Sequence, residues 1–160
     1  MRGYLLDVNH VGAFIREEPG IMAKARATPA EHLVWVSNIT LGEIEAGHRG
    51  MSQTTNQKAR NEFVRLVNEK LGSLKLEVSE HTPACYGEIM GRIWQKHPPS
   101  PKVKTEQHLL DLGVDINDVW TAAIAWEHGL TFLTQDGMAC IREALKQEIE
   151  DNEVAFDCWL

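Results

Sequence analysis

Short apolar runs alternate along this chain with longer stretches in which apolar residues recur every three or four positions. The runs contain β-branched and aromatic side chains, which is typical of buried strands, whereas the longer stretches have the spacing of amphipathic helices. The expected strands lie at residues 4–6, 33–36, 74–78 and 130–133. Strands that alternate with helices favour right-handed crossovers, so the sequence predicts an α/β fold with a parallel sheet covered by helices on both faces.

Polar and glycine residues mark the ends of the expected helices. Ser37, Asn38 and Thr40 are N-cap residue types, which predicts a helix that carries Glu43 in its first turn. Further helices are expected at residues 11–15, 56–71, 82–94 and 115–128. Pro19 and Gly20 are expected to close the first helix, and residues 97–107 to form a proline-rich loop.

The length of 160 residues suits one domain, residues 1–160, in which residues 50–107 supply a helical arm and the proline-rich loop. With 43% hydrophobic and 24% charged residues, the composition is that of a globular protein. Neither a secretory signal nor a membrane span is visible, so we expect a cytoplasmic protein without a membrane partner.

Four acidic residues are the strongest candidates for chemistry: Asp7, Glu43, Asp118 and Asp136. Each stands at the end of an expected strand or the start of an expected helix, where the carboxyl ends of parallel strands meet. Two carboxylates about 4 Å apart repel by roughly 4 kcal/mol, so such a cluster requires a cation or bound protons. Mg²⁺ or Mn²⁺ is the natural partner because hard cations prefer oxygen ligands.

Each acid also has a structural explanation. Glu43 would be stabilised by a helix dipole, Asp118 would suit a helix start, and Asp136 before Gly137 could form a turn. Four such coincidences together are harder to explain by local structure alone. Three cysteines without CxxC spacing suggest neither a disulfide framework nor zinc, and the thiols are expected to be buried. The seven histidines lack HExxH spacing; only His48, one turn past Glu43, could face the site.

Charge is distributed unevenly. The net charge is −7, but residues 49–104 hold ten Lys or Arg against five Glu, a local net charge of +5. This basic segment could hold phosphates beside an acidic cleft, or it could simply be a set of solvated helix faces. Trp94, on the apolar stripe of the helix at 82–94, could likewise stack on a base or pack in the core.

The segments YLLDVNH, SNITLGEIEAG and NDVWTAAIAWEHGLTFLTQD resemble those of PIN-domain nucleases, specifically VapC-type toxins, and the likeness covers nearly the whole chain. The resemblance implies a three-layer α/β/α sandwich with a mostly parallel central sheet. It also implies that Asp7, Glu43, Asp118 and Asp136 bind Mg²⁺ or Mn²⁺. The family's polar helper residues correspond to Asn9, Ser37 and Thr134.

The same resemblance implies function and partners. It points to a metal-dependent endoribonuclease that cuts a structured RNA such as tRNA and leaves 5′-phosphate and 3′-hydroxyl ends. The expected partners are a cognate small DNA-binding antitoxin and a second copy of the chain. Two departures stand out: Asp118 follows Glu43 by 75 positions, a long spacing, and residues 137–156 replace the family's aromatic-rich ending.

Three other functions were weighed. An inactive PIN scaffold that binds RNA or protein would need no acid quartet. A magnesium-dependent phosphatase of the haloacid dehalogenase type would show DxDxT, but Asn9 stands at the second acidic position. A receiver-like signalling domain would need an Asp ending a middle strand and a Lys after a late one, and neither is visible.

Overall fold

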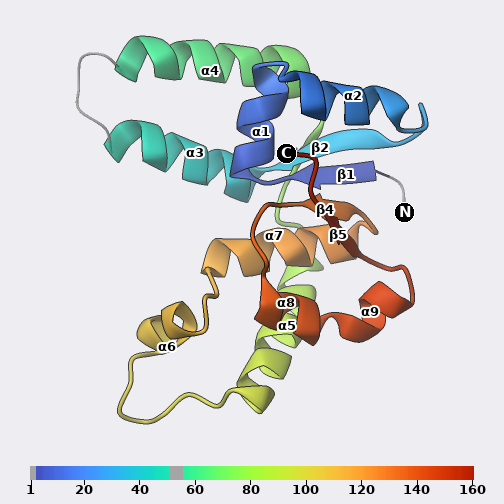
Figure 1. Cartoon of the computed structure of the whole chain (residues 1–160). Helices are drawn as coiled ribbons and strands as arrows, with labels where there is room; N and C mark the ends of the chain where they lie inside the picture. Colours follow the sequence, from blue (N-terminus) through green and yellow to red (C-terminus); the bar gives the residue numbers. More distant parts are fainter. Residues whose placement is uncertain (1–2, 51–55) are drawn as a thin grey trace.

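The computed structural model describes residues 3–50 and 56–160 and contains a five-stranded parallel sheet between two layers of helices (Figure 1). The strand order is β3-β2-β1-β4-β5, and every neighbouring pair is parallel. The predicted three-layer α/β/α sandwich is thus confirmed, with a fully parallel sheet. The strands are β1 (Gly3–Leu6), β2 (Leu33–Ser37), β3 (Lys75–Leu76), β4 (Thr131–Leu133) and β5 (Ala155–Asp157).

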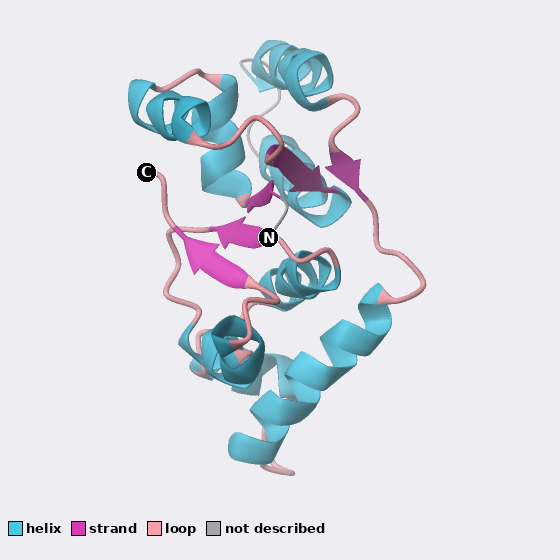
Figure 2. Ribbon diagram, turned by 90° about the vertical axis from the view of Figure 1, so that its right-hand side faces the viewer, coloured by secondary structure: helices cyan, strands magenta, loops and turns pink. Residues whose placement is uncertain are grey.

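The helices divide into two groups, and Figure 1 shows α1–α4 on one side of the sheet and α5–α9 on the other. The first group is α1 (Val8–Ile15), α2 (Pro19–Ala27), α3 (Asn38–Gly50) and α4 (Asn56–Leu71). The second is α5 (Thr82–Lys96), α6 (Thr105–Asp111), α7 (Ile116–Glu127), α8 (Ala139–Ala144) and α9 (Lys146–Glu150). Figure 2 shows the same layers after a quarter turn.

Alternation along the strands creates one hydrophobic core on each face of the sheet. Successive strand side chains point to opposite faces. Leu5 and its neighbour Phe132 on β4 pack with the α5 and α7 helices, whereas Leu6 and Leu133 pack with α1 and α4. Because the strands are in register, the two faces stay separate, and the strand ends are held at one edge of the sheet.

Several elements differ from the sequence prediction. Residues 19–27 form a helix, because proline is well tolerated at the first helical position, where its missing N–H leaves no bond unmade. The third strand is only two residues long, and Val78 lies outside it. The proline-rich loop gives way to α6 at Thr105. The last part of the chain forms α8, α9 and β5.

The expected helical arm at residues 50–107 does not form as one unit. Its first helix, α4, packs against α1 and α3, whereas α5 packs against α7 and α8 on the opposite face of the sheet. The apolar stripes explain this division: Val67 and Leu71 of α4 enter one core, and Ile89 and Ile93 of α5 enter the other. These two helices therefore belong to different layers of the fold.

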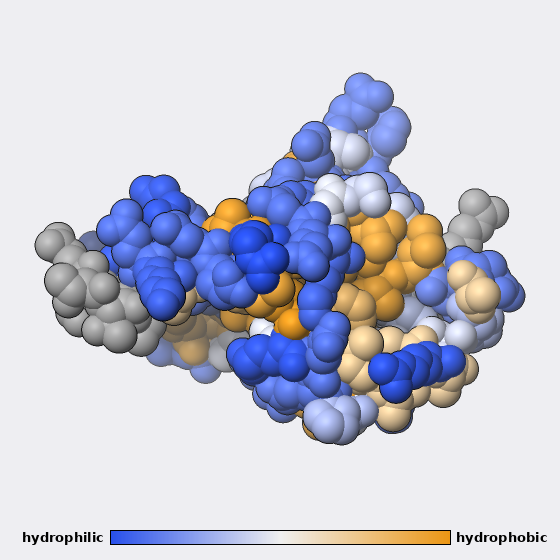
Figure 3. All heavy atoms as spheres, turned by 90° about the horizontal axis from the view of Figure 1, so that it is seen from above, coloured by the Kyte–Doolittle hydropathy of each residue, from blue (hydrophilic) through white to orange (hydrophobic). Residues whose placement is uncertain are grey.

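The surface over the α1–α4 layer is mostly hydrophilic, with hydrophobic residues showing between the polar ones (Figure 3). Within the part of the chain that the structure describes, no helix is both long and apolar enough to cross a bilayer.

Candidate metal centre

A cavity of about 170 Å³ opens at the carboxyl ends of β1 and β4, between α1, α3 and α7. All four acids identified in the sequence line it, and a fifth, Asp115, joins them. The sheet and helices thus bring together carboxylates that are up to 129 positions apart, from residue 7 to residue 136. The remaining lining residues are Val8, Asn9, Thr40, Thr121 and Phe132.

Asp7 follows β1 directly and is the N-cap of α1. Its Oδ1 atom accepts hydrogen bonds from the backbone N–H of His10 and from the His10 ring, both at 2.8 Å. The side chain is largely buried, and burial by itself would raise its pKa. Hydrogen bonds from His10 and from the Thr134 hydroxyl outweigh burial and lower the pKa of Asp7. This carboxylate is therefore charged across the physiological pH range.

Glu43 lies one turn further into α3 than the sequence suggested. The helix begins at Asn38, so its first turn contains no acid, and the helix-dipole explanation for Glu43 loses its force. Its Oε1 atom accepts a hydrogen bond from the Asn117 side chain at 3.1 Å. Burial raises the pKa of Glu43, the Asn117 bond opposes this, and the negative charges of Asp115 and Asp7 add to the rise.

Asp118 lies in the first turn of α7 and lines the cavity. Burial raises its pKa to about 7, and the negative charges of Asp115, Glu43, Asp136 and Asp7 contribute to the rise. The favourable dipole at the start of α7 does not offset this repulsion. Asp118 is thus the carboxyl group whose charge the surroundings tolerate least without a cation.

Asp136 is exposed at the mouth of the cavity, in the turn after β4. Its backbone N–H donates to the Thr134 hydroxyl at 3.0 Å, which fixes the turn. Asp115 was missed as a site residue, because its role as the N-cap of α7, accepting from the Asn117 N–H at 2.8 Å, already explains an Asp there. Its place three positions before Asp118 in the sequence was the available sign.

The three helper residues take different positions. Asn9 lines the cavity itself. Ser37 is fully buried and does not line it; its hydroxyl accepts from the Thr40 N–H at 3.0 Å and lies 2.9 Å from the Thr40 hydroxyl. Thr134 is also buried and contacts the site through Asp7 and Asp136. Ser37 and Thr134 therefore support cavity residues from behind.

The donor set fits a hydrated hard cation. Among the described residues, no three Asp, Glu, His or Cys side chains stand close enough to hold a metal ion in their present positions. Yet the cavity is ringed by carboxylate oxygens, and their repulsion raises the pKa of Asp118 to about 7. Mg²⁺ commonly retains several waters and binds through one or two carboxylates. Spaced carboxylates around an open cavity match that mode.

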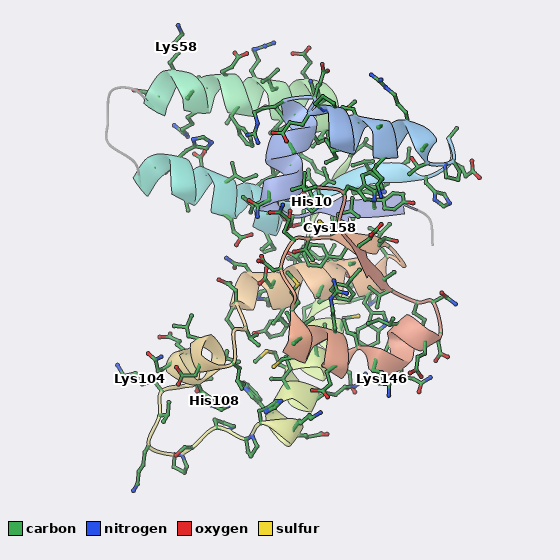
Figure 4. All side chains as sticks on the ribbon, viewed as in Figure 1. His10, Lys58, Lys104, His108, Lys146 and Cys158 are labelled. Carbon is green, nitrogen blue, oxygen red and sulfur yellow. The ribbon has the colours of Figure 1, made fainter. Side chains whose placement is uncertain are left out.

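Most cations of the basic segment are paired within the chain. Arg49 and Arg60 both bind Glu45, which joins α3 to α4. Among the residues that the structure describes, no ion pair or side-chain hydrogen bond is made by the side chains of Lys58, Lys102 and Lys104. Figure 4 shows Lys58 and Lys104 projecting away from the body of the molecule. Most charges of the basic segment are therefore explained as solvent-facing helix residues, without a role in phosphate binding. The other paired cations are Arg65, Lys70, Lys75, Arg92 and Lys96.

His48 and the cysteines lie outside the acidic cavity. The His48 ring packs against Phe63, with ring centroids 5.2 Å apart, in a neighbouring hollow that Glu43 also lines. Cys85, Cys140 and Cys158 are free thiols; the first two are half-buried and Cys158 is exposed, so the expectation of buried thiols was wrong for Cys158. Trp94 of α5 is 40% exposed rather than packed in the core.

A family model described as PIN domain matches residues 4–143. The chain belongs to the PIN domain family. A search of curated proteins found no match.

Solved structures with the same fold include toxin–antitoxin assemblies. A structure of VapBC2 from Rickettsia felis bound to a DNA fragment from their promoter matches this PIN domain with a TM-score of 0.66 at 14% identity, over 98% of both chains. VapBC-1 from nontypeable Haemophilus influenzae matches with 0.65 at 20% identity, over 98% of this chain and 97% of that one. FitAcB from Neisseria gonorrhoeae matches with a TM-score of 0.61 at 21% sequence identity, over 96% of this chain and 95% of that one. At these identities the likeness shows the fold.

Proposed function

We propose that this PIN domain is a metal-dependent endoribonuclease, the toxin of a VapBC-type toxin–antitoxin pair. The observation that carries the proposal is the cavity in which five carboxylates converge and the pKa of Asp118 rises to about 7. A cluster of this kind gains stability when a divalent cation replaces protons. Family membership supports nuclease chemistry, and the VapBC structures with the same fold support the toxin assignment.

The carboxylates would divide the work of holding the ion and orienting the attacking water. Asp7, which is charged and held by His10, and Asp118, at the base of the cavity, are the proposed direct ligands of Mg²⁺ or Mn²⁺. The bound ion would polarise the scissile phosphate and lower the pKa of a water. Glu43, which accepts a hydrogen bond from Asn117, would accept a proton from that water. Asp136 would bind through water at the open side.

The proposed partners follow from the same assignment. The substrate would be a structured RNA such as tRNA, cut to leave 5′-phosphate and 3′-hydroxyl ends. A second hollow, of about 370 Å³, adjoins the acidic cavity and shares Val8, Asn9 and Glu43 with it. We propose that a small DNA-binding antitoxin occupies this hollow and closes the site, and that the chain forms a homodimer.

An RNA cleavage assay tests the proposal. The purified protein is incubated with labelled total RNA and with Mg²⁺, Mn²⁺ or a chelator, beside the variants Asp7→Asn and Asp151→Asn. Asp7→Asn removes a cavity charge, whereas Asp151 lies after α9, where it accepts a bond from Gln147. We expect cleavage by the parent and by Asp151→Asn with metal only, and at least a ~100-fold loss in Asp7→Asn.

Two results would contradict the proposal. Equal cleavage by the parent and by Asp7→Asn would assign the activity to another protein or another site. RNA binding without cleavage in either metal would favour the inactive PIN scaffold.

A further inference from the structure

His10 is fully buried in α1, and both of its ring nitrogens have partners. Nδ1 lies 2.8 Å from the Asp7 Oδ1 atom. On the other side of the ring, Nε2 accepts a hydrogen bond from the backbone N–H of Trp159 at 3.1 Å. Figure 4 shows His10 at the centre of the molecule, beside the C-terminal segment that carries Cys158. The imidazole thus bridges the metal centre and the end of the chain.

The partners determine which ring nitrogen carries the proton. A backbone N–H can only donate, so Nε2 must present its lone pair to Trp159. The proton of the neutral ring then lies on Nδ1, from which it can be donated to the Asp7 carboxylate. A ring protonated on Nε2 would face the Trp159 N–H with a second N–H. The contact from Trp159 therefore selects the tautomer that holds Asp7.

The donor at Trp159 is held firmly in place. The Trp159 side chain is buried and packs against the Tyr4 ring, with ring centroids 4.5 Å apart. Its indole N–H donates to the Asp157 Oδ2 atom at 3.2 Å, and the Asp157 carbonyl accepts from the Thr134 N–H at 3.0 Å. Because β5 pairs with β4, the last residues are tied to the same sheet edge that carries the acids.

We infer that His10 is a positioning residue for Asp7, and that the C-terminal segment sets its tautomer. This inference rests on the proposed function, since it concerns how Asp7 would present itself to the metal ion. The two bonds from His10 converge on Oδ1 and restrain the carboxylate, which leaves Oδ2 without a bond to His10. A ring that orients a ligating carboxylate from behind raises metal affinity without touching the metal.

The tautomer can be observed directly. In ¹⁵N NMR spectra of the full-length protein, a protonated ring nitrogen and one with a free lone pair have widely separated chemical shifts. We expect a proton on Nδ1 of His10 and a lone pair on Nε2, the less common tautomer in free histidine. A proton on Nε2 would overturn the inference, whether or not the protein cleaves RNA.

Two substitutions separate positioning from packing. In His10→Asn, the amide nitrogen is attached to Cγ, as Nδ1 is, and can still donate to Asp7; in His10→Leu, no donor remains. We expect Mn²⁺ affinity, measured by calorimetry, to stay within ~3-fold of the parent in His10→Asn and to fall at least ~10-fold in His10→Leu. Ile89→Val, in the core on the far face of the sheet, controls for lost stability and should leave the affinity unchanged.

Equal affinity losses in His10→Asn and His10→Leu would show that packing, rather than the hydrogen bond to Asp7, matters. Unchanged affinity in His10→Leu would overturn the inference outright. If the parent protein itself binds no Mn²⁺, the proposed function fails instead. Crystal structures then decide the positioning: the Asp7 carboxylate should be rotated in His10→Leu and retained in His10→Asn, and an unmoved Asp7 in His10→Leu would contradict it.

Discussion

At the scale of single residues, the surroundings of one cavity shift the pKa values of its carboxyl groups in opposite directions. Hydrogen bonds from His10 and Thr134 overcome burial and lower the pKa of Asp7, whereas burial and four neighbouring acids raise that of Asp118 to about 7. Near neutral pH, Asp7 is fully charged while Asp118 is about half protonated. Under the proposed function, Asp7 would be a ligand that is already charged, and Asp118 would be one whose proton a cation displaces.

Asp118→Asn should make the metal-free protein more stable at high pH. The pKa of Asp118 is higher in the folded protein than in the unfolded chain. The group therefore contributes full stability below about pH 4, and this contribution is lost as the pH rises through 7. Removing the charge should stabilise the protein by ~1–2 kcal/mol at pH 8, after solvent screening is allowed for, and by close to zero at pH 4. Urea unfolding with chelator present measures both.

The matched control is Asp115→Asn, which removes a neighbouring charge while the Asn side-chain oxygen can still cap α7. Because Asp115 is exposed, its gain at pH 8 should be smaller than that of Asp118→Asn. If Asp118→Asn is equally destabilising at both pH values, the charge repulsion described here is absent.

Site residues could be predicted from the sequence where the residue type is unusual at its position. They could not be predicted where a common structural role, such as helix capping, already accounts for the residue. Asp7 stood out because an acid directly after an apolar strand points to a sheet edge. Asp115 did not, because capping explains it. His10 lies on an apolar helix face, where a buried histidine is common, and its partner Trp159 is 149 positions away. Only the assembled sheet brings those two together.

At the scale of elements, α7 presents Asp118 because small residues let it approach the sheet. Ala122, Ala123 and Ala125 are all fully buried in the core that α7 shares with α5. Larger side chains there would push the helix outward and move Asp118 with it. The depth of the acidic cavity is thus set partly by residues that carry no charge.

Ala123→Leu should therefore destabilise the fold by ~1–3 kcal/mol, because the surrounding core has no room for three further carbon atoms. The same change in Ala46→Leu, on the exposed side of α3, should be nearly neutral. Chemical denaturation of the two variants measures the difference. Equal effects at both positions would mean that α7 is not closely packed.

Long periodic elements were predictable from the sequence, and short ones were not. The expected helix at residues 56–71 matches α4 at both ends, because its apolar stripe spans four turns and Gly72 follows it. A proline at residue 19 is compatible both with the end of one helix and with the start of the next. The sequence pattern favoured the end of α1, whereas in the structure Pro19 starts α2. β5 has three residues, and pairing with β4 creates it rather than local preference.

At the scale of the whole molecule, the proposed function requires a negatively charged protein to bind a polyanion. Most cations of the basic segment are already paired with acids of the same chain, which leaves few to meet phosphates. Lys104, at the start of α6, is one of them, and α6 borders the acidic site through a hollow lined by Leu110, Asp115 and Asp118. We therefore expect RNA affinity to depend on the few lysines of this segment that are unpaired within the described part of the chain, Lys104 among them.

Lys104→Ala should lower RNA affinity and reduce the slope of log affinity against log salt concentration by about 0.7–0.9, the value for one phosphate contact. Lys146 is the matched control, because it pairs with Glu150 on α9, away from the cavity (Figure 4). Binding is measured in the Asp7→Asn background to prevent cleavage. Equal slopes in Lys104→Ala and in the unsubstituted background would place the RNA elsewhere.

Anomalous diffraction tests directly whether these carboxylates bind a metal ion. Crystals of the protein are soaked in Mn²⁺, and diffraction is measured at a wavelength where manganese scatters anomalously. We expect an anomalous peak in the cavity within coordinating distance of Asp7 and Asp118, with Glu43 and Asp136 around it. The peak should vanish in Asp7→Asn crystals. A cavity without a peak, or manganese bound only at other acids, would contradict the claim that these carboxylates form a metal centre.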